Sequence, residues 1–520
     1  MTICVNDIFL PVNHTVDDAF RAAVKKSGVK EDNISKLYIK KKSIDARGGE
    51  LKFVYSVCIS LHQPAKLSKR HDVKILEEYE YAVHPAKALK ERPVVVGFGP
   101  AGIFCAYLLT LYGAKPIVLE MGKSVDERKQ DVDLFFNTGV FNEKSNVQFG
   151  EGGAGTFSDG KLTTRINDKR CSFVLETFHK FGAEENILYE ARPHLGTDKL
   201  IDIVKKIRKF IEENGGEVHF QAEVTDLLIE KNEIRGVTLA DGEKIYTDKV
   251  VLAIGHSSRT MYELIYKLGI AMEKKPFSVG FRIEHSRDFI DSARFGKYAG
   301  NVQLGSADYQ FSYRQGDRGC YTFCMCPGGQ VIASNSERDS VVTNGMSKSD
   351  RSDVNSNSAV VASVLPQDLD VDILSGVEFQ RKLEKLAFTM GGENYSAPAQ
   401  LSCDFLNEKK TTAFKSFKPS YPLGTEFCDF NEVLPTKIKD MLKSGLADFD
   451  KKIKGFSSGD GILTGFETRT SAPLRILRGV DFNSVSIRGL YPCGEGAGYA
   501  GGITSAAVDG LRIAQAILEE

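Results

Sequence analysis

The sequence predicts an α/β fold whose main domain is assembled from segments that lie far apart in the chain. A valine strand, Val94–Val96, runs through a glycine turn into an apolar helix. A second buried strand, Val250–Leu252, ends at Gly255, and a third, Leu490–Pro492, leads through further glycines into a C-terminal helix. Short apolar strands that alternate with helices are typical of a parallel sheet.

The first glycine turn has the pattern of a Rossmann-type dinucleotide-binding unit. Gly97 permits the tight turn, Gly99 lets a pyrophosphate approach the backbone, and Gly102 lets the helix pack close to the sheet. Glu120 follows the next apolar run, 18 residues after Gly102, where a carboxylate can bind a ribose. The turn therefore predicts a bound dinucleotide.

Composition narrows the class of partner. The chain has 520 residues with 68 Lys plus Arg against 69 Asp plus Glu, so its net charge of −1 does not favour nucleic acid or anionic lipid. No apolar run approaches the ~18 residues of a membrane span, and ten scattered cysteines favour reduced thiols. We expect a soluble cytoplasmic protein with a small-molecule substrate, and the oligomeric state is open.

Changes in pattern divide the chain into four parts. Residues 1–88 form a small N-terminal α/β domain, with a helix at Val16–Ser27 and strands at Ser35–Lys40 and Leu51–Leu61. Residues 89–275 and 461–520 form the two parts of the dinucleotide domain. Residues 276–460 form an inserted α+β substrate domain.

Several elements of the dinucleotide domain follow from local patterns. We expect an amphipathic helix at Leu200–Asn214, strands at Glu217–Glu230 and Glu233–Leu239, and a helix at Thr504–Leu518. In the inserted domain, the polar stretch Ser336–Asn357 is expected to be a mobile surface loop, with a lid over the site as the alternative.

Taken together, these segments resemble the FAD domain of the glutathione-reductase-like flavoproteins. Two further motifs, Asn146–Leu162 and Phe466–Pro473, resemble a bacterial group of FAD-dependent dehydrogenases over nearly the whole chain. The resemblance implies tightly bound FAD, with Glu120 at the adenosine ribose, Val224 at the adenine and Glu495 near the ribityl chain or pyrophosphate. The implied cofactor residues are Gly97, Gly99, Pro100, Ala101, Gly102, Glu120, Gly153, Ala154, Gly155, Thr156, Phe157, Ser158, Val224, Ala253, Ile254, Gly255, Gly494, Glu495, Gly501, Gly502 and Ile503.

The sequence departs from the nicotinamide-using relatives in two respects. It has no second glycine fingerprint for a pyridine nucleotide, and no Cys-x-x-x-x-Cys pair follows the first fingerprint. These absences put a dedicated NAD(P)H domain and a disulfide-reductase mechanism in doubt. Transient binding of NAD(P)H at the flavin face stays open.

Candidate catalytic residues are Lys161, Arg469, His194 and Cys326. Lys161, Arg165 and Arg469 are cations expected near the site, with a surface or phosphate-neutralising role as the alternative. His194 and His285 could act as acid or base, or only hydrogen-bond locally. Thr197 or Asp198 is expected to cap the helix that follows His194.

The three cysteines Cys320, Cys324 and Cys326 could suggest a metal site. A fourth ligand at a short spacing is missing, so we expect no metal, and Cys326 is expected to be the accessible thiol.

The expected function is an FAD-dependent oxidoreductase that transfers a hydride between flavin and an unidentified organic substrate. Phe277, Phe281, Tyr313 and Phe323 are expected to line a pocket for an apolar or conjugated molecule. The alternative is a flavin-bearing, redox-sensing or binding module whose N-terminal domain recruits a protein or RNA partner.

Overall fold

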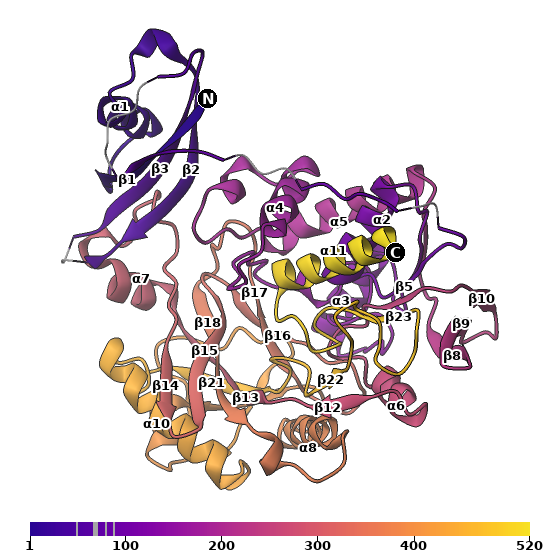
Figure 1. Cartoon of the computed structure of the whole chain (residues 1–520). Helices are drawn as coiled ribbons and strands as arrows, with labels where there is room; N and C mark the ends of the chain where they lie inside the picture. Colours follow the sequence, from indigo (N-terminus) through magenta and orange to yellow (C-terminus); the bar gives the residue numbers. More distant parts are fainter. Residues whose placement is uncertain (48–49, 66–70, 78–80, 87–88) are drawn as a thin grey trace.

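The computed structural model describes residues 1–47, 50–65, 71–77, 81–86 and 89–520. It has a mixed α/β fold, as predicted, in which a small N-terminal lobe lies beside a large body (Figure 1). The expected boundary at residue 88 lies outside the described residues. The other predicted domain boundaries stay predictions.

The N-terminal lobe is a four-stranded antiparallel sheet with one helix packed on it. The predicted helix Val16–Ser27 is confirmed, with a capping box at Thr15. The strand order is β2-β3-β1-β4, and the elements are β1 (Thr2–Pro11), α1 (Val16–Ser27), β2 (Ile34–Asp45), β3 (Lys52–Leu61) and β4 (Val73–Ile75).

This lobe is attached to the large body through strand β2. The Lys42 amide donates to the Tyr189 carbonyl oxygen at 2.7 Å, and the Ala191 amide donates to the Lys42 carbonyl oxygen at 2.8 Å. Lys42 also forms an ion pair with Glu190 at 2.9 Å.

The central sheet has five parallel strands in the order β23-β11-β5-β6-β7. It joins strands from both ends of the large body, namely β5 (Val94–Val96), β6 (Ile117–Leu119), β7 (Glu217–His219), β11 (Val250–Leu252) and β23 (Leu490–Pro492). The accompanying helices are α2 (Pro100–Leu111), α3 (Val125–Thr138), α4 (Arg170–Lys180), α5 (Gly196–Glu213) and α11 (Ile503–Glu519).

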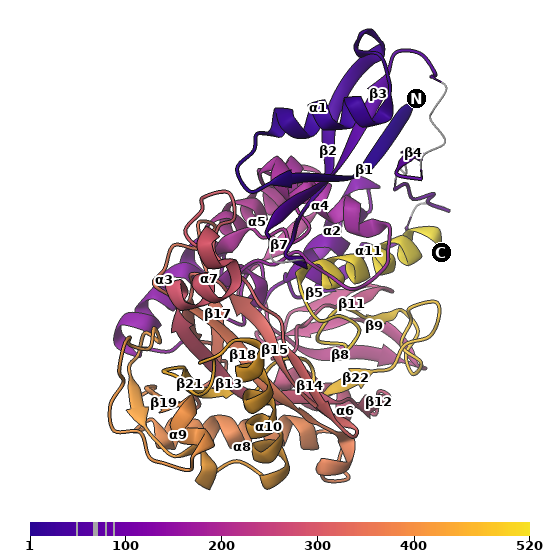
Figure 2. The same ribbon diagram turned by 90° about the vertical axis from the view of Figure 1, so that its left-hand side faces the viewer.

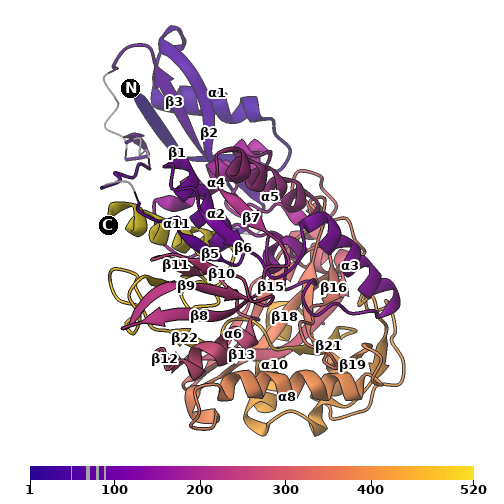
Figure 3. The same ribbon diagram turned by 90° about the vertical axis from the view of Figure 1, so that its right-hand side faces the viewer.

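The prediction of one strand over Glu217–Glu230 is wrong. The chain leaves the parallel sheet after His219, passes through Gln221 at φ 55°, and enters a separate three-stranded antiparallel sheet (Figure 3). That sheet contains β8 (Val224–Glu230), β9 (Glu233–Leu239) and β10 (Lys244–Tyr246), and it is followed after β11 by α6 (Arg259–Lys267).

A mixed seven-stranded sheet forms the rest of the body, with α8 and α10 on its outer side (Figure 2). Its order is β14-β15-β18-β13-β21-β19-β20, with β13 (Phe277–Ser286), β14 (Ser312–Gln315), β15 (Arg318–Cys326), β18 (Asn355–Val364), β19 (Ala397–Leu401), β20 (Thr425–Phe427) and β21 (Ile462–Glu467). The helices are α7 (Arg287–Phe295), α8 (Ser375–Met390), α9 (Ser402–Leu406) and α10 (Thr436–Lys452).

Strand β21 belongs to this sheet by pairing with β13 and β19, although the predicted division groups it with the dinucleotide domain. Two short ribbons complete the body. They are β12 (Met272–Lys274) with β22 (Leu474–Ile476), and β16 (Gln330–Ala333) with β17 (Thr343–Met346).

The prediction of a surface loop at Ser336–Asn357 is wrong. The segment contains β17 and the start of β18, and Ser340, Thr343 and Asn357 are buried. Its polar side chains make internal hydrogen bonds, such as those of Ser347 to Asp159 and of the Ser340 hydroxyl to the Glu337 carbonyl oxygen. Satisfied polar groups can be buried, so polarity alone misled the prediction.

Candidate functional site

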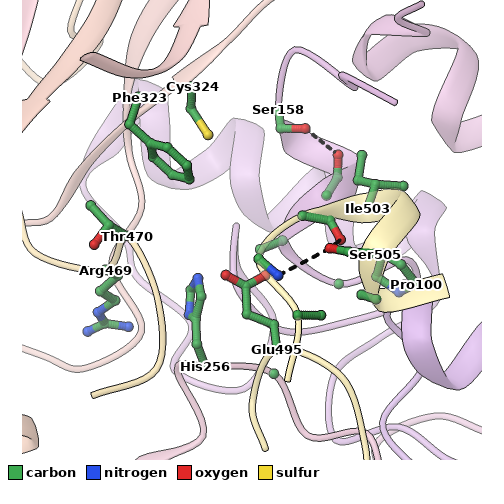
Figure 4. A pocket seen from close by; sticks show the side chains of 18 of the residues that line it. Pro100, Ser158, His256, Phe323, Cys324, Arg469, Thr470, Glu495, Ile503 and Ser505 are labelled. Atoms are coloured by element: carbon green, nitrogen blue, oxygen red, sulfur yellow. Dashed lines mark hydrogen bonds between the residues drawn. The ribbon is translucent and has the colours of Figure 1, made fainter. Parts of the chain in front are cut away.

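A cavity of about 1610 Å³ lies between the carboxyl ends of the parallel strands and the inner face of β14 and β15. Figure 4 shows side chains from both regions facing it, including Glu495, His256 and Phe323. Small-molecule pockets usually enclose ~300–1,000 Å³. The volume therefore leaves room for a dinucleotide and a second ligand.

The glycine turn at the end of β5 forms one end of the cavity. Gly97 has φ 96°, and a Cβ atom there would lie 2.5 Å from the Ala253 carbonyl oxygen. A Cβ atom at Gly102 would overlap with the Gly97 carbonyl oxygen. At Gly99 the nearest atom would be the Cα of Gly153, at 3.6 Å, so this glycine leaves free space on the cavity side.

Such a cradle of backbone at a helix N-terminus fits the pyrophosphate of a dinucleotide. The first N–H groups of α2 have no partner within the helix and point toward the cavity end of the turn. The residues present therefore fit the cofactor that the sequence resemblance implies.

Glu120 lies at the end of β6, lines the cavity and is 5% exposed. Its carboxylate accepts hydrogen bonds from the amides of Phe98 at 2.8 Å, Gly122 at 2.9 Å and Gly150 at 2.9 Å. It thereby ties the glycine turn to the loop at residues 146–153. A carboxylate oxygen accepts more than one bond, so Glu120 can still bind a ribose hydroxyl.

A fully buried arginine, Arg128 of α3, holds the loop at residues 146–153. Its guanidinium donates to five backbone carbonyl oxygens at 2.7–3.3 Å, those of Asn146, Val147, Gly150, Glu151 and Gly153. Burial lowers the pKa of Arg128 to about 10, so it stays charged at neutral pH. Sequence reasoning missed this residue, because nothing in one sequence separates it from the surface arginines.

The opposite wall of the cofactor end comes from the C-terminal segment. Gly501, Gly502 and Ile503 line the cavity where α11 begins. Glu495 also faces it, and burial raises the pKa of this carboxyl to about 7, although Lys275 opposes the shift.

Arg469 lines the cavity, and its guanidinium forms an ion pair with the buried Glu384. Its Nη2 lies 2.8 Å from Glu384 Oε2, and Arg259 Nη2 lies 2.7 Å from Glu384 Oε1. Burial alone would raise the pKa of Glu384, but Arg259 and Arg469 hold it well below its usual range. The three groups form a buried, charged support for this wall.

His256 follows β11 and lines the cavity between Arg469 and Glu495 (Figure 4). Burial, followed by the charges of Arg469 and Arg259, lowers the pKa of His256 to about 3. Sequence reasoning missed it, although its position directly after Gly255 was an available signal.

The aromatic wall differs in part from the prediction. Tyr313 and Phe323 line the cavity, as expected. Phe277 and Phe281 do not, because both are buried in the core of the large sheet, where Phe281 packs against Phe430 at 4.2 Å between ring centroids.

The prediction that Cys326 is the accessible thiol is wrong. A bulge in β15 between Phe323 and Cys326 gives Cys324 a φ of 42° and turns its side chain into the cavity (Figure 4). Cys326 is 1% exposed and accepts a contact from Arg282 at 3.6 Å. Burial raises the pKa of Cys324 to about 12, so its thiol is protonated at neutral pH.

The other candidate residues have different positions. Lys161 lines the cavity and donates to the Met325 carbonyl oxygen, and Arg165 lines its mouth. His194 lies behind this wall, 3.1 Å from the Ser349 carbonyl oxygen, and burial lowers its pKa. His285 is buried against the Phe456 carbonyl oxygen at 2.7 Å.

The predicted cap of α5 is wrong. The helix begins at Gly196, and the Asp198 carboxylate accepts from the Ser349 amide at 2.8 Å instead. The Thr197 hydroxyl likewise donates to the Thr156 carbonyl oxygen, which ties α5 to the glycine loop.

Of the residues predicted to hold the cofactor, all but Gly102, Thr156, Phe157 and Gly494 line the cavity. Gln148, Ser257 and Lys275 line it and were not predicted.

Comparison with known proteins identifies the class. Residues 276–470 match the family described as "FAD-dependent protein, C-terminal domain-like", and residues 2–60 match a domain of unknown function, DUF8436. The first match confirms the predicted cofactor, FAD, at the level of the family. The protein is thus a flavoprotein by class.

The chain is 46% identical to an "Uncharacterized protein" of Clostridium beijerinckii, over 100% of this chain and 99% of the relative. It belongs to the same family as that clostridial protein.

Solved structures are more distant. Glycine oxidase from Bacillus cereus has 12% identity over 83% of this chain and 98% of its own, with a TM-score of 0.33. GidA from Aquifex aeolicus has 12% identity over 82% of this chain and 64% of its own, with a TM-score of 0.35. Likenesses at this level do not establish a shared activity. Nothing in the comparisons supports the alternative of a module that recruits a protein or RNA partner.

Within the described residues, the helices lack the combination of length and apolar character that crossing a bilayer requires.

Proposed function

We propose that this protein is an FAD-dependent oxidoreductase that transfers a hydride between flavin and an organic substrate. The observation that carries the proposal is a cavity of about 1610 Å³ with the Gly97–Gly99 turn at one end and an aromatic wall at the other. Its size supports two ligands side by side.

The cofactor end would hold FAD through groups already described. Gly97, Gly99 and the start of α2 would receive the pyrophosphate, and Glu120 the adenosine ribose. Val224 would lie at the adenine and Glu495 at the ribityl chain. When bound, FAD supplies the hydride chemistry, and the protein positions the substrate and excludes water.

The chain itself supplies the electrostatics of the reacting end. The N-terminus of α11, at Ile503, directs the positive end of its dipole into the cavity. Lys161 and Arg469 add positive charge to the walls. His194 does not line the cavity, and Cys326 borders it while being only 1% exposed, so we assign the electrostatic role to Lys161 and Arg469 and none to these two.

The substrate would bind against β14 and β15, where Tyr313, Tyr321 and Phe323 line the cavity. These rings favour an apolar or conjugated molecule. NAD(P)H could enter the same space as a transient reductant.

The test is purification of the full chain with its visible spectrum recorded, followed by release and identification of the flavin. Rapid mixing with NADH and with NADPH then measures bleaching of the flavin absorbance. We expect a yellow protein whose flavin is FAD and is reduced by a small-molecule donor. A colourless protein that does not bind added FAD would overturn the proposal.

A further inference from the structure

The imidazole of His256 lies in the cavity wall, and one of its ring nitrogens has a protein partner. Its Nδ1 lies 3.0 Å from the hydroxyl oxygen of the neighbouring Ser257. No group in the described part of the chain hydrogen-bonds to its Nε2, which faces the cavity (Figure 4). The free nitrogen is therefore available to a ligand.

A chain of buried hydrogen bonds decides which nitrogen carries the proton. The Ser257 hydroxyl donates to Gln148 Oε1 at 3.0 Å, and Gln148 Nε2 donates to the Ser334 hydroxyl oxygen at 2.5 Å and to the Ser334 carbonyl oxygen at 3.4 Å. The carbonyl can only accept, so it sets the orientation of the Gln148 amide. All three residues are buried.

The tautomer follows from the count of protons. A serine hydroxyl has one proton, and that of Ser257 is given to Gln148. Ser257 must therefore accept from His256, which places the imidazole proton on Nδ1. In the neutral ring, Nε2 then carries a lone pair.

The surrounding charges keep the ring neutral and restrict its ligand. Burial and the guanidinium groups of Arg469 and Arg259 lower the pKa of His256. The charge of Lys275 lowers this pKa further, and the carboxylate of Glu384 opposes the shift. The cations that lower this pKa disfavour a cationic donor, and an anion without a proton cannot donate to a lone pair.

We propose that Nε2 of His256 accepts a hydrogen bond from a neutral O–H or N–H group of a ligand in the cavity. The inference deepens the proposed function, because the donor group can belong to FAD or to the second ligand. Both sources share this chemistry, and the test distinguishes them.

The first arm of the test needs no bound cofactor. We would label the nine histidines with ¹⁵N, remove any flavin, and assign the His256 resonances by their loss in H256Q. We expect protonated Nδ1 and unprotonated Nε2 at every pH from 5.5 to 8. A proton on Nε2, or a doubly protonated ring in this range, would overturn the proposal.

Two serine variants control for the hydrogen-bond chain. Ser257→Ala removes the acceptor at Nδ1, so we expect the single tautomer to become a mixture. The next residue, Ser258, makes no side-chain hydrogen bond to the N-terminus of α6. Ser258→Ala should therefore leave the tautomer unchanged. If both variants keep the wild-type tautomer, the chain through Gln148 does not set it and the argument fails.

The second arm identifies the donor. FAD is added to the apoprotein, and phenol or anisole is then added to the FAD-loaded protein. Phenol is a neutral O–H donor suited to the aromatic wall, and anisole is its match without the proton. An upfield shift of Nε2 with FAD assigns the donor to the cofactor. A shift with phenol but not anisole assigns it to the second ligand.

A shift with neither FAD nor phenol overturns the proposal. If FAD does not bind at all, the proposed function fails. The first arm and the phenol titration of the apoprotein still report on His256 in that case, so the two failures are distinguishable.

Discussion

A Cβ atom at Gly510 of α11 would overlap with the carbonyl oxygen of Ala101 in α2. The two helices therefore cross in backbone contact, and both begin at the cavity. A side chain at Gly510 would push apart the two helix N-termini that line the cofactor end.

We expect Gly510→Ala to destabilise the protein by about 1–3 kcal/mol, the usual cost of overpacking a core. It should also weaken FAD retention, because both helix starts move. Thermal unfolding with and without added FAD measures both effects. Ala516→Ser, on a half-buried face of the same helix, should stay within about 0.5 kcal/mol of wild type.

Two glycine variants should separate folding from cofactor binding. Gly99→Ala places a methyl group 3.6 Å from its nearest neighbour, Gly153 Cα, so the apoprotein should unfold at the wild-type temperature. FAD binding should weaken at least tenfold, because the methyl group fills the space of the pyrophosphate. Gly97 has φ 96°, and an added Cβ atom would lie 2.5 Å from the Ala253 carbonyl oxygen. Gly97→Ala should therefore lower the stability of the apoprotein instead. Equal flavin content in wild type and Gly99→Ala would contradict this assignment.

Arg128→Met should release the loop at residues 146–153. The substitution leaves five carbonyl oxygens without their donor, and each unmatched buried group costs ~1–3 kcal/mol before relaxation. We expect loss of bound FAD and faster proteolysis of this loop. Arg128→Lys retains the charge with fewer donors and should give an intermediate result. If the amides of residues 146–153 kept their wild-type protection from hydrogen exchange in Arg128→Met, Arg128 would not be what holds this loop.

Glu495 should make the apoprotein less stable as pH rises. Its folded pKa of about 7 lies above the ordinary 4.5, so the favourable protonated form is complete below pH 4.5 and is lost as pH passes 7. At about 1.4 kcal/mol per pKa unit, the loss is at most about 3.5 kcal/mol. Urea unfolding at pH 5 and 8 measures it, and Glu495→Gln should flatten the difference. An equal pH dependence in the variant would exclude Glu495 as its source.

Cys324 should be the thiol of β15 that reacts with an alkylating reagent. It faces the cavity, whereas Cys320 and Cys326 are buried. The raised pKa makes the reaction slow at pH 7 and faster toward pH 10. Peptide mass spectrometry after iodoacetamide treatment identifies the site. Preferential labelling of Cys326 would show that the bulge does not orient these side chains as described.

The sequence was sufficient for the parts of the fold and of the site that depend on local geometry. The Gly97–Gly102 turn and the helix Val16–Ser27 could be predicted because spacing and caps decide them within a few residues. The joining of β5, β11 and β23 followed from their shared character as short apolar strands.

The rest depends on contacts between distant residues. Gln148 and His256 come together only when the loop after α3 and the loop after β11 meet through Ser257. Phe281 and Phe323 look alike in a strand pattern, yet Phe281 pairs with Val360 of β18 and Phe323 pairs with the next residue, Ala359. The two rings therefore lie on opposite faces of the sheet, one toward the core and the other toward the cavity.

The hydrogen bonds between Lys42 and the segment at residues 189–191 have a consequence for any shortened form of this protein. Ala191 and Arg192 border the mouth of the cavity, and Ala191 obtains its backbone partner from the N-terminal sheet. Removal of that sheet would leave an amide and a carbonyl at the rim without partners. The N-terminal lobe therefore helps to hold backbone at the entrance of the site in place, although none of its described residues lines the cavity.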